Sequence, residues 1–159
     1  MLKLMGAAAV ILAAGSLGIR KYNELCERRR ILVAIRSGAQ SIYNNIECMC
    51  MPLDECFLTG GELFSDSAEF MRKGALPCDA VKNAADRMRV LTKEDKACIH
   101  RFAEGLCAQN SHGQIRNLKL FQSELERCIE SSSKEIETKG KLFVKGSFLG
   151  GAAVALLLF

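Results

Sequence analysis

Uncharged and largely apolar residues gather at the two ends of the chain. The first such segment, 4–19, has sixteen residues and a basic residue on each side; the last, 146–159, has fourteen. A helix rises about 1.5 Å per residue, so the first would cover about 24 Å of a hydrocarbon layer about 30 Å thick. Flanking basic side chains can reach the headgroups and lengthen both segments. We therefore predict transmembrane helices over 1–20 and 142–159.

Between these ends, over 21–141, apolar residues recur at the spacing of helices. One stripe continues the N-terminal segment and predicts a single long helix that ends before Pro52, because the residue preceding a proline is displaced from helical geometry. That stripe consists of Leu25, Leu32, Ile35, Ala39, Ile42 and Ile46. A second stripe predicts a last helix with Ser111 as candidate N-cap. Ser131–Ser133 are expected on its polar outer face, with a flexible break of the helix as the alternative. This stripe consists of Ile115, Leu118, Leu125, Ile129 and Ile136.

Shorter helices are predicted between the two long ones. Two of them, 53–58 and 62–73, are followed by glycines that end them. A third begins at Pro77, because proline is favoured at the first position of a helix. A fourth begins after Thr92, which with an acidic residue three positions later is a candidate N-cap, and runs through Leu106. No alternating run suggests a strand. We predict an all-α protein, a cytosolic helical bundle between N-terminal and C-terminal transmembrane helices.

The distribution of charge supports this arrangement and predicts on which side of the membrane the middle of the chain lies. Residues 20–30 carry five basic against two acidic side chains and residues 134–145 carry four against two, whereas 31–133 carry twelve against fourteen. The positive excess borders the apolar ends and spares the middle, which speaks against a nucleic-acid groove. Because cytoplasmic flanks of membrane helices are rich in lysine and arginine, the middle is expected in the cytoplasm and the protein in the cell membrane with two spans.

Small residues suggest how the two membrane segments meet each other. Gly146 and Gly150 form a G-x-x-x-G pattern, and Ala14 and Gly18 repeat the same spacing of small residues in the first segment. Such faces let two helix backbones approach closely in lipid. We take these four residues as candidate helix-packing positions.

Eight cysteines are the most conspicuous feature of the composition. In a secreted chain with a processed N-terminus they would indicate a disulfide-stabilised helical protein. In a cytosolic head they stay reduced, where they are small core residues or belong to a membrane-anchored thiol or metal sensor. Cys48, Cys50 and Cys56 lack the spacing that suits zinc, and a second candidate ligand set is weak because its first two members point about 200° apart on a helix. That set is Cys98, His100, Cys107 and His112. We expect no metal and no cofactor.

Enzymatic motifs are missing from the sequence. It has no phosphate-binding glycine loop, no zinc-protease spacing, and only two histidines without a nucleophile pattern around them. The adjacent acidic residues Glu94 and Asp95 diverge on a helix and suit its N-terminus better than acid–base catalysis. We expect a protein that binds partners and is not an enzyme.

Order and spacing of residues along nearly the whole chain resemble the stage III sporulation protein AB family of endospore-forming bacteria. The resemblance covers both apolar ends and several segments between them. These segments are Met1–Ala7, Leu25–Arg30, Gln40–Ile42 with Ile46, Pro52–Glu55, Phe102–Leu106, Leu118–Arg127 and Gly146–Gly151. Departures include Asn45 and Asn110, where acidic residues are usual, and Cys107, where glycine is usual.

The resemblance implies a role in the channel complex between mother cell and forespore. It implies a head similar to the cytoplasmic domains of inner-membrane platform proteins in type II secretion and type IV pilus machines. Such platforms meet a hexameric secretion ATPase; here the corresponding partners would be a stage III protein AA-type ATPase, other channel subunits and further copies of the chain. The membrane would be the outer forespore membrane. Candidate ATPase-binding residues are Glu55, Glu62, Glu104, Asn110 and Gln114.

Overall fold

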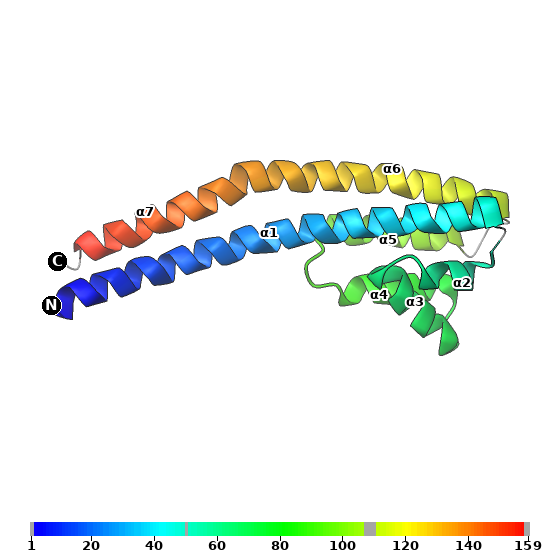
Figure 1. Cartoon of the computed structure of the whole chain (residues 1–159), viewed down its shortest axis with the longest axis horizontal. Helices are drawn as coiled ribbons and strands as arrows, with labels where there is room; N and C mark the ends of the chain where they lie inside the picture. Colours follow the sequence, from blue (N-terminus) through cyan, green and yellow to red (C-terminus); the bar gives the residue numbers. More distant parts are fainter. Residues whose placement is uncertain (1, 50, 107–110, 158–159) are drawn as a thin grey trace. The chain divides into compact units, whose positions relative to one another are not determined.

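The computed structural model describes the backbone of residues 2–49, 51–106 and 111–157, and side chains over 12–49, 51–106, 113–147 and 149–154 (Figure 1). The described residues form helices and turns and contain no strand, which confirms the predicted all-α class. In chain order the elements are α1 (Leu2–Met49), α2 (Leu53–Leu58), α3 (Glu62–Arg72), α4 (Pro77–Arg87), α5 (Lys93–Leu106), α6 (Ser111–Glu135), the π-helix η1 (Ile136–Gly140) and α7 (Lys141–Leu157).

The chain divides into two compact units. We call residues 30–130 the central unit and residues 1–29 with 131–159 the terminal unit. Along the residues that the structure describes, no helix is both long enough and apolar enough to cross a bilayer. The two predicted transmembrane helices are therefore not confirmed, and the predicted boundaries around 21–141 stay predictions.

In the central unit α1 is the helix that the first apolar stripe predicts. Leu32, Ala39 and Ile42 are completely buried on one face of it. It ends at Met49, and Pro52, with extended backbone, then precedes the first residue of α2. Gly38 lies on the same buried side, where a Cβ would be only 1.7 Å from the carbonyl oxygen of Gly60. The absence of a side chain at Gly38 thus lets α1 reach the α2–α3 turn.

Four phenylalanine rings connect the helices of the central core. Phe57 of α2 packs against Phe64 of α3 with ring centroids 5.3 Å apart, and Phe64 meets Phe102 of α5 edge-on at 6.3 Å. Phe102 in turn stacks on Phe121 of α6 at 4.2 Å. All four are buried, so this run of rings links α2, α3, α5 and α6 in one apolar core.

Turn residues set the ends of the short helices as the sequence predicts. Gly61 and Gly74 have φ of 86° and 92°, a left-handed backbone that glycine adopts without strain, and they flank α3. Pro77 is the first residue of α4. Before α5, the Thr92 amide donates to the Asp95 carboxylate at 3.0 Å, and the Asp95 amide donates to the Thr92 hydroxyl at 3.3 Å. These reciprocal bonds form a capping box and confirm Thr92 as the N-cap.

In the terminal unit α1 and α7 approach closely at a glycine. A Cβ on Gly18 would lie 2.1 Å from the Ser147 hydroxyl oxygen and 2.7 Å from the Phe143 carbonyl oxygen. Gly151, one turn beyond Ser147, is also buried. The backbones therefore meet through small residues, and Gly18 is one of the four that the sequence singled out.

The other three predicted packing positions are not buried in this contact as Gly18 is. Gly146 and Gly150 are exposed, and no atom of the described residues lies within 4 Å of where a Cβ would be, so the G-x-x-x-G face is not the one that meets the described part of α1. Successive helix positions are about 100° apart, which places Gly146 well off the contact line through Ser147. Ala14 is half-buried.

The prediction for the three serines of α6 is wrong at one position. Ser132 is completely buried, and its hydroxyl has no hydrogen-bond partner among the described residues. The hydroxyl of Ser133 accepts from Arg29 Nε at 2.9 Å, while Ser131 is exposed. Three consecutive residues span about 200° around a helix, and Ser132 falls on the side that faces inward here. The cap predicted at the Ser111 side chain lies outside the described side chains.

Candidate interaction surface

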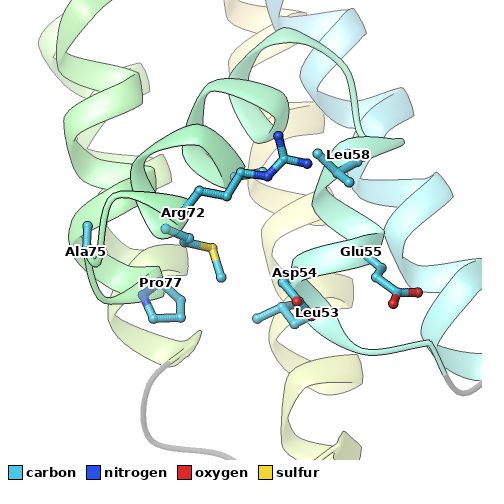
Figure 2. Close-up of a pocket in the computed structure, with 9 residues that line it drawn as sticks. Leu53, Asp54, Glu55, Leu58, Arg72, Ala75 and Pro77 are labelled. Atoms are coloured by element: carbon cyan, nitrogen blue, oxygen red, sulfur yellow. The ribbon is translucent and has the colours of Figure 1, made fainter.

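A groove of about 550 Å³ opens on the central unit between α2, α3 and the start of α4 (Figure 2). We call it the α2–α3 groove. Apolar side chains make most of its wall, and charged side chains stand at its rim. The apolar residues are Leu53, Leu58, Ala68, Met71, Ala75 and Pro77; the charged ones are Asp54, Glu55 and Arg72.

Local sequence explains why this surface is open. Gly74 turns the chain after α3, so that Ala75 of the α3–α4 connection and Pro77 at the start of α4 line the groove. The six residues of α2 bury Cys56 and Phe57 and leave Asp54, Glu55 and Leu58 exposed. Leu58 keeps 47% of its surface accessible. A large exposed leucine beside unpaired charges is typical of a surface that meets another protein.

The structure distributes the predicted partner-binding residues over several helices. Glu55 stands at the rim of the α2–α3 groove, and Glu62 is the exposed first residue of α3. Glu104 on α5 accepts from Lys82 Nζ at 3.1 Å, an ion pair that raises the pKa of Lys82. Gln114 is half-buried on α6, and Asn110 lies outside the described residues. The three glutamates are thus available on different elements and do not form one cluster.

The residues of the candidate metal set do not converge in the part that the structure describes. The thiol of Cys98 is buried, while His100 lies beside the Asp86 carboxylate at 3.2 Å. Cys107 and the side chain of His112 lie outside the described residues. No group of three metal-ligating side chains occurs among the described residues.

Six cysteines within the described residues form no disulfide. They are at positions 26, 48, 56, 78, 98 and 128. Hydrogen bonding to Cys128, together with burial, raises the pKa of the Cys98 thiol, and burial raises that of Cys56. A raised thiol pKa lowers the thiolate fraction and with it the reactivity. Cys98 and Cys56 therefore have the character of core residues.

The sequence did not lead us to predict one buried ion pair in the terminal unit. Arg28, which we counted only as part of a basic flank, is 93% buried and forms an ion pair with Glu135 at the end of α6. Lys139 of η1 donates to the other oxygen of Glu135 at 2.6 Å. The signal was present, because Arg28 falls between Leu25 and Leu32 on the apolar stripe, at a position where a side chain must turn inward.

We compared the chain with protein-family models, curated proteins and solved structures to assign its family. The family model described as stage III sporulation protein AB matches residues 3–159. No curated protein and no solved structure matches the chain significantly. The match covers both apolar ends and the whole helical body between them, as the sequence resemblance does. The chain therefore belongs to the stage III sporulation protein AB family, a family of sporulation proteins.

Proposed function

We propose that the protein is a non-catalytic membrane platform of the channel between mother cell and forespore, and that its central unit docks a secretion-type ATPase. The observation that carries this proposal is the family match, which takes in apolar ends and helical body together. A platform needs both parts: anchors in lipid and a folded surface for a partner. The absence of a nucleotide-binding or hydrolytic motif in the sequence fits a role in binding.

Membrane attachment is supported by the sequence of the two ends. Sixteen and fourteen consecutive uncharged residues stand at the termini, and nine lysines and arginines flank them on the inner side against Lys3 outside. The positive-inside rule then puts the central unit on the mother-cell cytosolic face of the outer forespore membrane. Two tests address this. Carbonate washing should leave the full-length chain in the membrane, and external protease should not digest residues 30–130 in sealed cells. Release by carbonate would contradict the anchors, and digestion would contradict the orientation.

The proposed ATPase contact uses exposed polar side chains of the central unit. Glu62 and Glu104 present carboxylates on α3 and α5, and Glu104 is held by Lys82 in a defined position. Exposed charges at the rim of an interface accelerate association and select the partner more than they add affinity. We include Glu55, Asn110 and Gln114 in the proposed contact, the partner being a stage III protein AA-type ATPase.

A binding measurement with single variants tests the contact. The full-length chain in detergent is titrated with the purified ATPase, and alanine replaces Glu62, Glu104 or Gln114 in turn. Replacement of Glu62 or Glu104 at a true contact should slow association, with an effect that shrinks at high salt, whereas replacement of the uncharged Gln114 should speed dissociation at any salt concentration. Glu47→Ala, an exposed glutamate on α1, is the matched control. Unchanged association in all the variants, Glu55→Ala and Asn110→Ala included, would refute this assignment of the contact.

A further inference from the structure

The α2–α3 groove has charges of opposite sign at its two ends. In Figure 2 the Arg72 guanidinium lies near Leu58, whereas the Asp54 carboxylate lies with Leu53 at the opposite side. Among the described residues, none of Asp54, Glu55 and Arg72 has an ion-pair partner. The groove thus presents the order acidic, apolar, basic, with all three charges available to a ligand.

A surface on α6 presents the reverse order. Leu120 is 61% exposed, Arg116 stands one turn before it and Glu124 one turn after it. We call these three residues the α6 ridge. Residues four apart share one face of a helix, so the ridge runs basic, apolar, acidic along a single line. Arg116 has no ion-pair partner in the described part of the chain, and Glu124 accepts from Arg101 at 2.9 Å.

Two hollows border Leu120. One of about 410 Å³ is lined by Arg116, Asn117 and Leu120 together with Gly113. A smaller one, of about 70 Å³, lies toward α5 and is lined in part by Leu120 and Glu124. The surface around the exposed Leu120 is therefore open to a segment of another molecule.

We propose that the α6 ridge of one copy docks in the α2–α3 groove of a second copy. Leu120 then covers the apolar wall around Leu58 and Met71. Arg116 meets Asp54 and Glu55, and Arg72 shares Glu124 with Arg101. Both halves of this contact are present on every chain, and their charge order is complementary from end to end.

The contact uses different surfaces on the two copies. Such a heterologous contact leaves one free groove and one free ridge in every pair, so it continues into a ring or an open row. One leucine with a few charges makes a small interface, which is weak between molecules that diffuse freely. Confinement of the copies to one membrane raises their effective concentration, and this last step rests on the proposed function.

Photo-crosslinking of the full-length chain tests the contact directly. p-Benzoylphenylalanine replaces Ser123, an exposed residue beside the ridge, and isotope-labelled and unlabelled chains are mixed in liposomes. The proposal expects mixed-isotope crosslinks from position 123 to peptides within 53–77. Crosslinks only within one chain, or only to other segments, would overturn it. Flotation of the liposomes reports membrane attachment separately; if the chain does not float, the same mixture in detergent at millimolar concentration replaces the liposome experiment.

Charge exchange decides whether the pairing is the proposed one. Glu55→Arg or Arg116→Glu alone should lower the crosslink yield by about tenfold, as loss and reversal of a charge pair would. A mixture of the two single variants should regain the yield, because the basic groove of one accepts the acidic ridge of the other. A crosslink yield that recovers only in the mixture cannot be explained by a folding defect of either variant, because each variant has the same fold in the mixture as alone. No recovery, or equal losses with the controls Glu47→Arg and Arg89→Glu, would refute the contact. Binding of the ATPase by Arg116→Glu should be unchanged, which separates this proposal from the platform role.

Discussion

Arg28 and Glu135 form an ion pair between α1 and the last residue of α6, in the terminal unit. The guanidinium is almost completely buried, whereas the carboxylate keeps partial access to water and also receives a hydrogen bond from Lys139 at 2.6 Å. Burial of a charged group is tolerable only when partners replace the water that it loses. The pair therefore fixes how α1 and the end of α6 align immediately before η1 begins.

Removing the carboxylate should weaken the protein considerably. Glu135→Ala leaves the buried Arg28 without its main counter-charge, and we expect a loss of about 2–3 kcal/mol in the free energy of unfolding. Urea unfolding of the full-length chain in detergent, followed by circular dichroism, measures this. Glu137→Ala, at an exposed position two residues on, should change stability by less than about 0.5 kcal/mol. Equal losses in the two variants would show that the ion pair is not what stabilises this region.

Stability should also fall in acid through the same residue. The hydrogen bond from Lys139, with the charge of Arg28, holds the pKa of the Glu135 carboxyl below its ordinary value. A lowered folded-state pKa means that the stabilisation is complete above the ordinary carboxyl pKa, about 4.3, and is lost as the pH falls through the folded value. Melting temperatures between pH 6 and 3 should drop less steeply in Glu135→Gln than in the unaltered chain. Parallel curves would contradict this account.

The capping box of α5 should contribute through one buried carboxylate. Asp95→Ala removes the acceptor for the Thr92 amide at 3.0 Å, and we expect a loss of about 1–2 kcal/mol in unfolding free energy. Glu94→Ala, the exposed neighbour in the same turn, should lose only a few tenths through the helix dipole. Chemical denaturation of both variants checks the difference. A loss in Glu94→Ala as large as that in Asp95→Ala would show that charge at the helix start matters and the cap does not.

Gly18 of α1 and Gly146 of α7 should respond to alanine in opposite directions. Gly18→Ala places a methyl group 2.1 Å from the Ser147 hydroxyl oxygen and should destabilise the α1–α7 contact. Gly146→Ala adds its methyl group where no atom of the described residues lies within 4 Å, and should stabilise the helix by up to about 1 kcal/mol. Thermal unfolding in detergent compares the two. If Gly146→Ala is the more harmful change, the exposed G-x-x-x-G face has a partner of its own.

Thiol labelling should distinguish core cysteines from surface ones. Burial raises the pKa of Cys56, and the hydrogen bond to Cys128 together with burial raises that of Cys98. Iodoacetamide at neutral pH should therefore modify these two at least about tenfold more slowly than the exposed Cys48. Mass spectrometry of peptides over time measures the rates. Rapid modification of Cys98 would favour the thiol-sensor hypothesis over a packing role.

Much of the fold could be predicted because local signals are strong here. Proline and the two left-handed glycines end or begin helices through their own backbone geometry, wherever the rest of the chain lies. The Thr92 cap needs only a residue three positions away. Family membership could be anticipated for a similar reason, since order and spacing along the chain are properties of the sequence.

What the sequence determined by itself is the all-α class, the ends of the short helices of the central unit and the apolar stripe of α1, because these depend on dihedral preferences and on periodicity within one segment. Only the tertiary structure decided which residues meet. The rotation of α7 brings Ser147 to Gly18 and leaves Gly146 outside, the turn at Gly74 opens the α2–α3 groove, and the approach of α6 to α1 gives the buried Arg28 its carboxylate. Each of these depends on contacts between residues far apart in the chain, which no pattern within a single helix contains.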